Sequence, residues 1–112
     1  MEIWHNNRCS KSRNAIQLLD EKKADYEVFY YLETPPNEKQ IKELLSKLGM
    51  KAEDLIRKGE KDYKENFKGK ELSEKEWISA MAKYPKLIER PILVKGDKAV
   101  VGRPTENLLE LL

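Results

Sequence analysis

The sequence predicts an α/β protein with one mixed four-stranded sheet, helices flanking it, and a helical insert between the second and third strands. The two ends of the chain carry this prediction. The chain opens with a strand, an amphipathic helix and a second strand, and it closes with a strand hairpin and a helix. A long stretch with helical periodicity separates the two ends. Short apolar runs that alternate with amphipathic helices are typical of such folds.

The opening stretch predicts a β-α-β unit. Ile3–His5 forms a short apolar strand, and a helix begins around Ser10 and continues to about Lys23, with its apolar residues on one side. Tyr26–Leu32 is rich in aromatic and β-branched residues, which favours a second strand. The crossover is long enough for the two strands to be parallel.

The predicted insert covers approximately residues 37–84. Asn37 and Gln40 have the spacing of a capping box at the start of a helix. Ser73 starts a second capping box, and Pro85 ends the helix that follows it. The insert is therefore predicted to consist of helices, with short helical turns joined by Gly59 and Gly69 over Lys51–Lys70.

The closing stretch predicts a hairpin and a helix. Ile92–Lys95 and Lys98–Val101 form strands, and the Gly96-Asp97 loop between them favours a type II′ turn. Glu106–Leu112 carries leucines that indicate a last helix. We expect residues 1–112 to form a single domain, because this length suits one hydrophobic core.

The composition excludes several classes of protein. The 22 basic and 20 acidic residues give a net charge of +2, which argues against a nonspecific nucleic-acid binder. A single cysteine cannot form an intrachain disulfide, and neither a signal peptide nor a membrane-spanning run is visible. We expect a cytoplasmic monomer that binds neither membranes nor nucleic acid directly.

Cys9 is the first candidate for chemistry. It lies where the first strand gives way to a helix, and the unpaired amides and dipole at a helix start favour the nucleophilic thiolate. Arg8, Lys11 and Arg13 add positive charge nearby. The alternative is a buried, inert cysteine that acts as a small hydrophobic residue. The polar and basic neighbours favour the reactive thiol.

The residues around Cys9 restrict that chemistry. One Cys and His5 do not supply a tetrahedral metal site, so no metal is expected. His5 could act as the base of a hydrolase, but at a strand end it could equally bond the adjoining loop. Ser12 replaces the second cysteine of a C-x-x-C pattern, so any reduction requires an external thiol. Ser12 can also donate a hydrogen bond to the Cys9 thiolate.

Three arginines extend the hypothesis from a thiol to an oxyanion site. Lysine is the common cation of this chain, so Arg57, Arg90 and Arg103 stand out, and the last two each precede a proline. Arginine binds oxyanions with several donors at once, and junctions between loops and regular elements often hold binding residues. The alternative is that all three are surface cations. A helix start over Cys9 would accept the same anion.

Several motifs resemble those of the ArsC-type arsenate reductase family across essentially the whole chain. They are His5-Asn6-x-x-Cys9-Ser10-Lys11-Ser12-Arg13, Leu55-Ile56-Arg57-Lys58, Leu87-Ile88-Glu89-Arg90-Pro91-Ile92 and Gly102-Arg103-Pro104. The resemblance implies a thioredoxin-like fold with a helical insert and a cis peptide at Pro91. Asn7 departs from the pattern, because many members have proline there, and this makes the loop before Cys9 less rigid.

The resemblance also implies roles for these residues. Cys9 is the nucleophile that attacks arsenate, His5 and Ser12 stabilise its thiolate, and an arginine triad binds the oxyanion. The active-site loop comprises Asn6, Arg8, Ser10, Lys11 and Arg13. Glutathione then serves as co-substrate, with no bound cofactor, and glutaredoxin as protein partner completes the reduction to arsenite.

Two other functions stay open for the same pattern. One is a glutathione-dependent thiol reductase with a substrate other than arsenate, since the thiolate and the arginines would serve both enzymes. The other is a regulator similar to the Spx type, which binds the RNA polymerase α-subunit. Many such regulators carry a C-x-x-C switch, whereas this chain has Ser12 in the second position.

Overall fold

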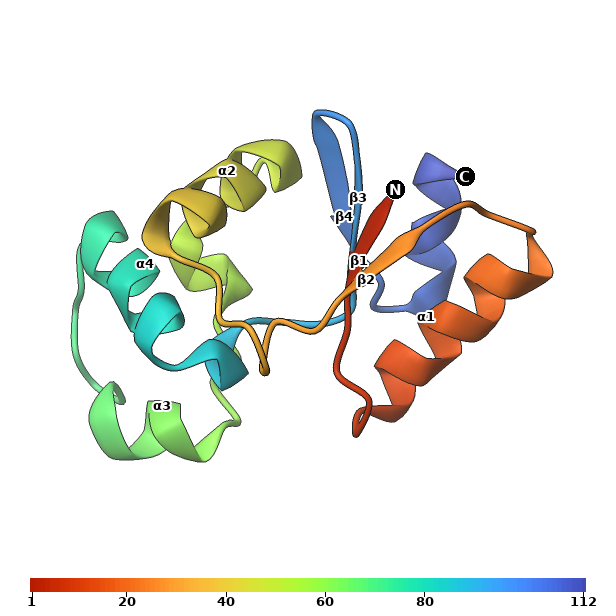
Figure 1. The fold of residues 1–112 in the computed structure, drawn as a ribbon. Helices are drawn as coiled ribbons and strands as arrows, with labels where there is room; N and C mark the ends of the chain where they lie inside the picture. Colours follow the sequence, from red (N-terminus) through yellow and green to blue (C-terminus); the bar gives the residue numbers. More distant parts are fainter. The chain divides into compact units, whose positions relative to one another are not determined.

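The computed structural model describes all residues from Met1 to Leu112. The chain divides into two compact units: residues 1–34 with 90–112, and residues 35–89. The first unit contains the sheet, and the second is the helical insert (Figure 1). The predicted insert of residues 37–84 thus ends five residues short of the observed unit, because the segment 85–89 pairs with residues 55–57 of the same unit.

The first unit is built on the predicted mixed sheet. Its strands are β1 (Glu2–Trp4), β2 (Glu27–Phe29), β3 (Ile92–Lys95) and β4 (Lys98–Val101), in the order β2-β1-β3-β4. β1 pairs parallel with β2 and antiparallel with β3, and β3 pairs antiparallel with β4. The predicted fold class is confirmed.

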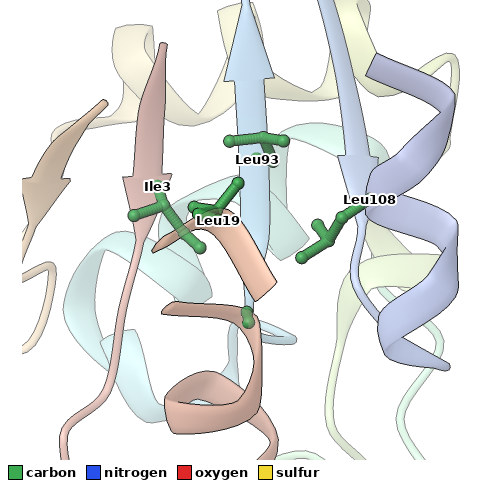
Figure 2. Packing of buried hydrophobic residues seen from close by; sticks show 5 residues of the cluster. Ile3, Leu19, Leu93 and Leu108 are labelled. Atoms are coloured by element: carbon green, nitrogen blue, oxygen red, sulfur yellow. The ribbon is translucent and has the colours of Figure 1, made fainter. Parts of the chain in front are cut away.

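One face of this sheet is covered by α1 (Ser10–Glu21) and by the C-terminal η3 (Thr105–Leu111). Ile3 and Leu93 lie opposite each other in the β1–β3 register and therefore point to the same face. Figure 2 shows them packed with Leu19 of α1 and Leu108 of η3, and all four are fully buried. This cluster holds α1 against the sheet through the middle and last turns of the helix.

Two elements of the first unit differ from their predicted form. β2 ends at Phe29 rather than Leu32, because the amides of Tyr31, Glu33 and Thr34 donate to carbonyls within residues 29–30 and turn the chain. The last helix is a 3₁₀-helix. Residues three apart lie on one side of such a helix, so Leu108 is buried, whereas Leu109 and Leu112 are exposed.

The predicted turn between β3 and β4 is confirmed in its backbone. Gly96 has a φ of +61°, and Asp97 is not among the residues with positive φ. A positive φ at the first central position alone is the mark of a type II′ turn, which glycine adopts without steric cost. The hairpin brings the residues after β4 back beside those before β3.

The insert contains five helical segments. They are α2 (Glu38–Leu48), η1 (Ala52–Leu55), α3 (Lys61–Asn66), α4 (Glu74–Lys83) and η2 (Pro85–Leu87). α2 packs on α4, and Trp77 of α4 stacks on Tyr63 with ring centroids 6.3 Å apart. Trp77 and Met81 are buried, as their spacing predicts for core residues.

Both predicted capping boxes are present at the starts of α2 and α4. At α2, the Asn37 side chain accepts from the Gln40 amide at 2.8 Å, and the Gln40 side chain accepts from the Asn37 amide at 2.9 Å. We expect Asn37→Ala to lower the free energy of unfolding by about 1 kcal/mol, because one helix-end donor loses its partner. Chemical denaturation measures the change, with exposed Lys39→Ala as control; equal stability of the two variants would contradict this role.

Candidate active site

Cys9 is the N-cap residue of α1, with an extended backbone (φ −96°, ψ 122°). The N-cap position places its sulfur beside the free amides of the first helical turn. Burial alone raises the pKa of the Cys9 thiol. The Ser12 amide, the Arg90 side chain and the Lys11 amide oppose that effect and lower the pKa to about 7. A large share of Cys9 is therefore thiolate at neutral pH.

Arg90 and Arg103 both act on this sulfur. Arg103 Nη2 lies 3.5 Å from Cys9 Sγ, and Arg103 Nε donates to the Arg90 carbonyl at 2.7 Å. Arg90 contributes a hydrogen bond and its charge to the low pKa of Cys9. The two Arg-Pro pairs, predicted as binding residues because of their place in the chain, thus meet at the start of α1.

The two Arg-Pro segments are held side by side by their backbones. The Gly102 amide donates to the Pro91 carbonyl at 2.8 Å, and the peptide bonds before Pro91 and Pro104 are both cis. A Cβ at Gly102 would lie 3.0 Å from both Leu108 Cδ2 and Pro91 Cγ. The sequence analysis named Gly102 only as part of the Gly102-Arg103-Pro104 motif and gave it no role, although its place between β4 and Arg103 was a signal for a close approach.

His5 contacts Asn7 and Tyr30. Its Nε2 lies 2.8 Å from Asn7 Oδ1, and its ring meets Tyr30 edge-on at 5.9 Å. Burial lowers the pKa of His5, the bond to Asn7 raises it, and the charge of Arg13 lowers it. The net pKa lies below the usual value, so His5 is mainly neutral at pH 7 and donates from Nε2. Its Nδ1 is buried and has no hydrogen-bond partner.

The first turn of α1 fastens the loop between β1 and Cys9. Ser12 is fully buried, and its Oγ accepts from the Asn6 amide at 3.3 Å. The Cys9 amide donates to the Asn6 carbonyl, and Arg13 Nη1 donates to the Asn7 carbonyl at 2.9 Å. Arg13 and Ser12 therefore act on the loop through its backbone. Sequence reasoning treated Asn7 only as a departure from a proline and missed its bond to His5.

The other predicted loop residues, Arg8, Ser10 and Lys11, have exposed side chains. The Arg8 amide donates to Asn6 Oδ1 at 3.0 Å, which closes a turn ahead of Cys9. Arg57 lies in the insert, where it pairs with two carboxylates. Its Nη1 is 2.8 Å from Glu89 Oε1, and its Nε is 3.5 Å from Glu60 Oε1.

Comparison with known proteins identifies the family. Residues 4–111 match the ArsC family. This chain belongs to the ArsC family. The arsenate reductase of Neisseria meningitidis serogroup A is 41% identical, over 100% of this chain and 97% of its own. The protein of Escherichia coli K12 named uncharacterized protein YfgD is 47% identical, over 100% of this chain and 96% of its own.

A solved structure agrees with this membership. The arsenate reductase from Vibrio cholerae has a TM-score of 0.93 and 42% identity, and the match covers 100% of this chain and 98% of that one. The thioredoxin-like ArsC fold implied by the motifs is thus confirmed. No helix of the chain is long and apolar enough to cross a membrane.

The arrangement in this ArsC-family chain suits attack by sulfur on an anion. Guanidinium groups and helix-start amides are donors for an oxyanion, and the same groups stabilise the thiolate. No group of three His, Cys, Asp or Glu side chains is placed to hold a metal ion. Cys9 is the chain's one cysteine, so a disulfide partner for it must come from another molecule.

The low pKa of Cys9 predicts how fast the thiol is alkylated. We expect the rate of alkylation by iodoacetamide to rise with pH, to reach half of its maximum near pH 7 and to level off above that pH, because only the thiolate reacts. An ordinary thiol has a pKa of about 8.5. Arg90→Gln removes a charge and a donor, so its midpoint moves upward, whereas exposed Lys98→Gln in β4 leaves it unchanged. A wild-type rate that still climbs through the ordinary range would contradict an activated thiolate.

Proposed function

We propose that this protein is an arsenate reductase in which the Cys9 thiolate attacks arsenate and outside thiols complete the reduction. The observation that carries the proposal is the Arg103 guanidinium 3.5 Å from the Cys9 sulfur, a thiol whose pKa is about 7. The nucleophile and a donor for an oxyanion are thus adjacent. Relatives named arsenate reductase support the choice of arsenate among oxyanions.

The proposed reaction begins at sulfur. Cys9 Sγ forms a bond to arsenic, and one arsenate oxygen takes up protons and leaves as water. A glutathione thiolate then attacks Sγ, and the electron pair of the sulfur–arsenic bond stays with arsenic, which leaves as arsenite. The two electrons that reduce As(V) to As(III) come from the two thiols, which are left as a Cys9–glutathione disulfide. Glutaredoxin returns Cys9 to the thiol by exchange.

The arginines hold the anion in this proposal. Arg90 and Arg103 would neutralise arsenate beside the sulfur, and the first-turn amides of α1 would add neutral donors. Arg57 is assigned to the same anion because its motif matches the family pattern. The use of an external thiol is supported by the sequence, since Cys9 has no partner cysteine in this chain, and glutathione is the thiol that we propose.

Purified wild-type protein tests the proposal directly. Arsenite is measured after incubation with arsenate, glutathione and glutaredoxin, with each component omitted in turn. We expect repeated turnover only in the complete mixture. Without glutaredoxin, arsenite release stops after a single turnover, and without glutathione or arsenate no arsenite forms. If no arsenite forms but the protein reduces other glutathione mixed disulfides, it is a thiol reductase with another substrate. If neither reaction occurs and the protein binds purified RNA polymerase α-subunit, the regulator is favoured.

A further inference from the structure

The insert holds a cluster of one arginine and two glutamates, which we call the Arg57 cluster: Arg57, Glu60 and Glu89. The backbone fixes two of its members. Ile56 and Ile88 form an antiparallel bridge, the Arg57 amide donates to the Leu87 carbonyl at 2.7 Å, and the Glu89 amide donates to the Leu55 carbonyl at 3.0 Å. Arg57 and Glu89 are therefore held on adjacent segments, and their side chains meet at 2.8 Å.

The third member, Glu60, lies three residues after Arg57 on the same segment. The Glu60 amide donates to the Arg57 carbonyl at 3.2 Å, and Glu60 Oε1 lies 3.5 Å from Arg57 Nε. This ion pair is not a hydrogen bond, since the buried Nε has no hydrogen-bond partner. Nη1 donates to Glu89 and the buried Nε faces Glu60, so Nη2, which makes no hydrogen bond, is the donor left for an anion while two carboxylates face the guanidinium.

These charges are only partly exposed. The side chains of Arg57, Glu60 and Glu89 are 22%, 24% and 29% accessible. Salt screens such groups less than fully exposed ones, so an anion that binds Arg57 senses both carboxylates. An ionised carboxylate only accepts hydrogen bonds. It repels an oxyanion that has no proton, whereas an oxyanion with an O–H group can donate to it.

We propose that Glu60 and Glu89 make the Arg57 cluster selective for tetrahedral oxyanions that carry a proton over those that do not. At neutral pH, arsenate and phosphate retain a proton, whereas sulfate is fully ionised. The cluster therefore accepts arsenate and phosphate through Arg57 and a carboxylate together, and it rejects sulfate. This inference rests on the proposed function in one respect, the use of Arg57 to bind the oxyanion.

Binding constants measured without any reductant test this selectivity. Phosphate, arsenate and sulfate are titrated into the protein by calorimetry at neutral pH and constant ionic strength. We expect the wild type to bind phosphate and arsenate more tightly than sulfate. In Glu89→Gln the amide can donate to sulfate, so sulfate affinity rises on the order of tenfold, about 1.4 kcal/mol, while phosphate affinity changes little. Glu60→Gln shifts selectivity the same way by a smaller factor.

Two further variants isolate the cause. Glu53→Gln is the matched control, since Glu53 pairs with Lys58 at 3.3 Å in the same unit but is 54% accessible; we expect its selectivity to match the wild type. In Arg57→Gln/Glu89→Gln, the gain in sulfate binding disappears. Each of three results would overturn the proposal. They are a wild type that binds all three anions equally, a Glu89→Gln variant that gains affinity for all three equally, and a gain in sulfate affinity that persists when Arg57 is also replaced.

The outcome is separate from that of the arsenate reductase assay. A protein that forms no arsenite but prefers phosphate over sulfate would lose the proposed function and keep the selectivity. A protein that forms arsenite without this preference would do the reverse. Circular dichroism of each variant checks that it is folded, and Glu60→Gln tests the proposal independently of Glu89.

Discussion

We expect replacement of Cys9 by serine to abolish arsenite formation while the protein stays folded. Serine is close to cysteine in size, but its hydroxyl is not ionised at neutral pH and cannot form the disulfide that carries the two electrons. We therefore expect activity to fall to the background of glutathione with arsenate. Arsenite release is measured in the complete mixture with equal amounts of wild type and Cys9→Ser.

A thermal melt of the same samples is the control. Cys9 is only partly buried, and its backbone bonds to Asn6 and Arg13 do not depend on the side chain, so the melting temperature should change little. Residual arsenite formation by a folded Cys9→Ser protein would show that another group carries the chemistry.

Arg103→Gln has the second largest expected effect. Arg103 contacts the sulfur at 3.5 Å through Nη2 and the Arg90 carbonyl at 2.7 Å through Nε, so its loss removes charge, a donor and a support of Arg90. Loss of one preorganised donor to a developing anion costs roughly 10²–10³ in rate. We expect kcat/KM for arsenate to fall by about that factor.

Arg103→Lys is the matched variant for this prediction. Lysine keeps the charge but lacks the guanidinium group that contacts the Cys9 sulfur and the Arg90 carbonyl at the same time. We therefore expect a kcat/KM between those of the wild type and Arg103→Gln. Steady-state kinetics separate the two variants. Full activity of Arg103→Gln would remove Arg103 from the oxyanion site and leave Arg90 as the guanidinium beside Cys9.

Local patterns predicted the elements of the fold because their causes are local. The capping box of Asn37 and Gln40 lies within one helical turn, and Gly96 alone accounts for the turn between β3 and β4. The early end of β2 has a different cause. Its sequence continues to favour a strand, but backbone bonds after Phe29 turn the chain.

Contacts within the site could be predicted only in part. Cys9 at a helix start was evident from the change of periodicity, whereas its contact with Arg103 joins residues 94 positions apart. The pairing of Arg57 with Glu89 spans 32 positions, and no periodicity reports such a partner. The bond between His5 and Asn7 is local, but an asparagine in a loop has many possible partners.

In the proposed reaction, Cys9 attacks arsenate and receives its second thiol from outside. Intact-protein mass spectrometry tests it when wild-type protein is incubated with arsenate and glutathione but without glutaredoxin. We expect a Cys9–glutathione disulfide that accumulates only when arsenate is present and disappears when glutaredoxin is added. A protein that stays unmodified, or one that forms the disulfide equally without arsenate, would show that Cys9 does not react with arsenate in this way.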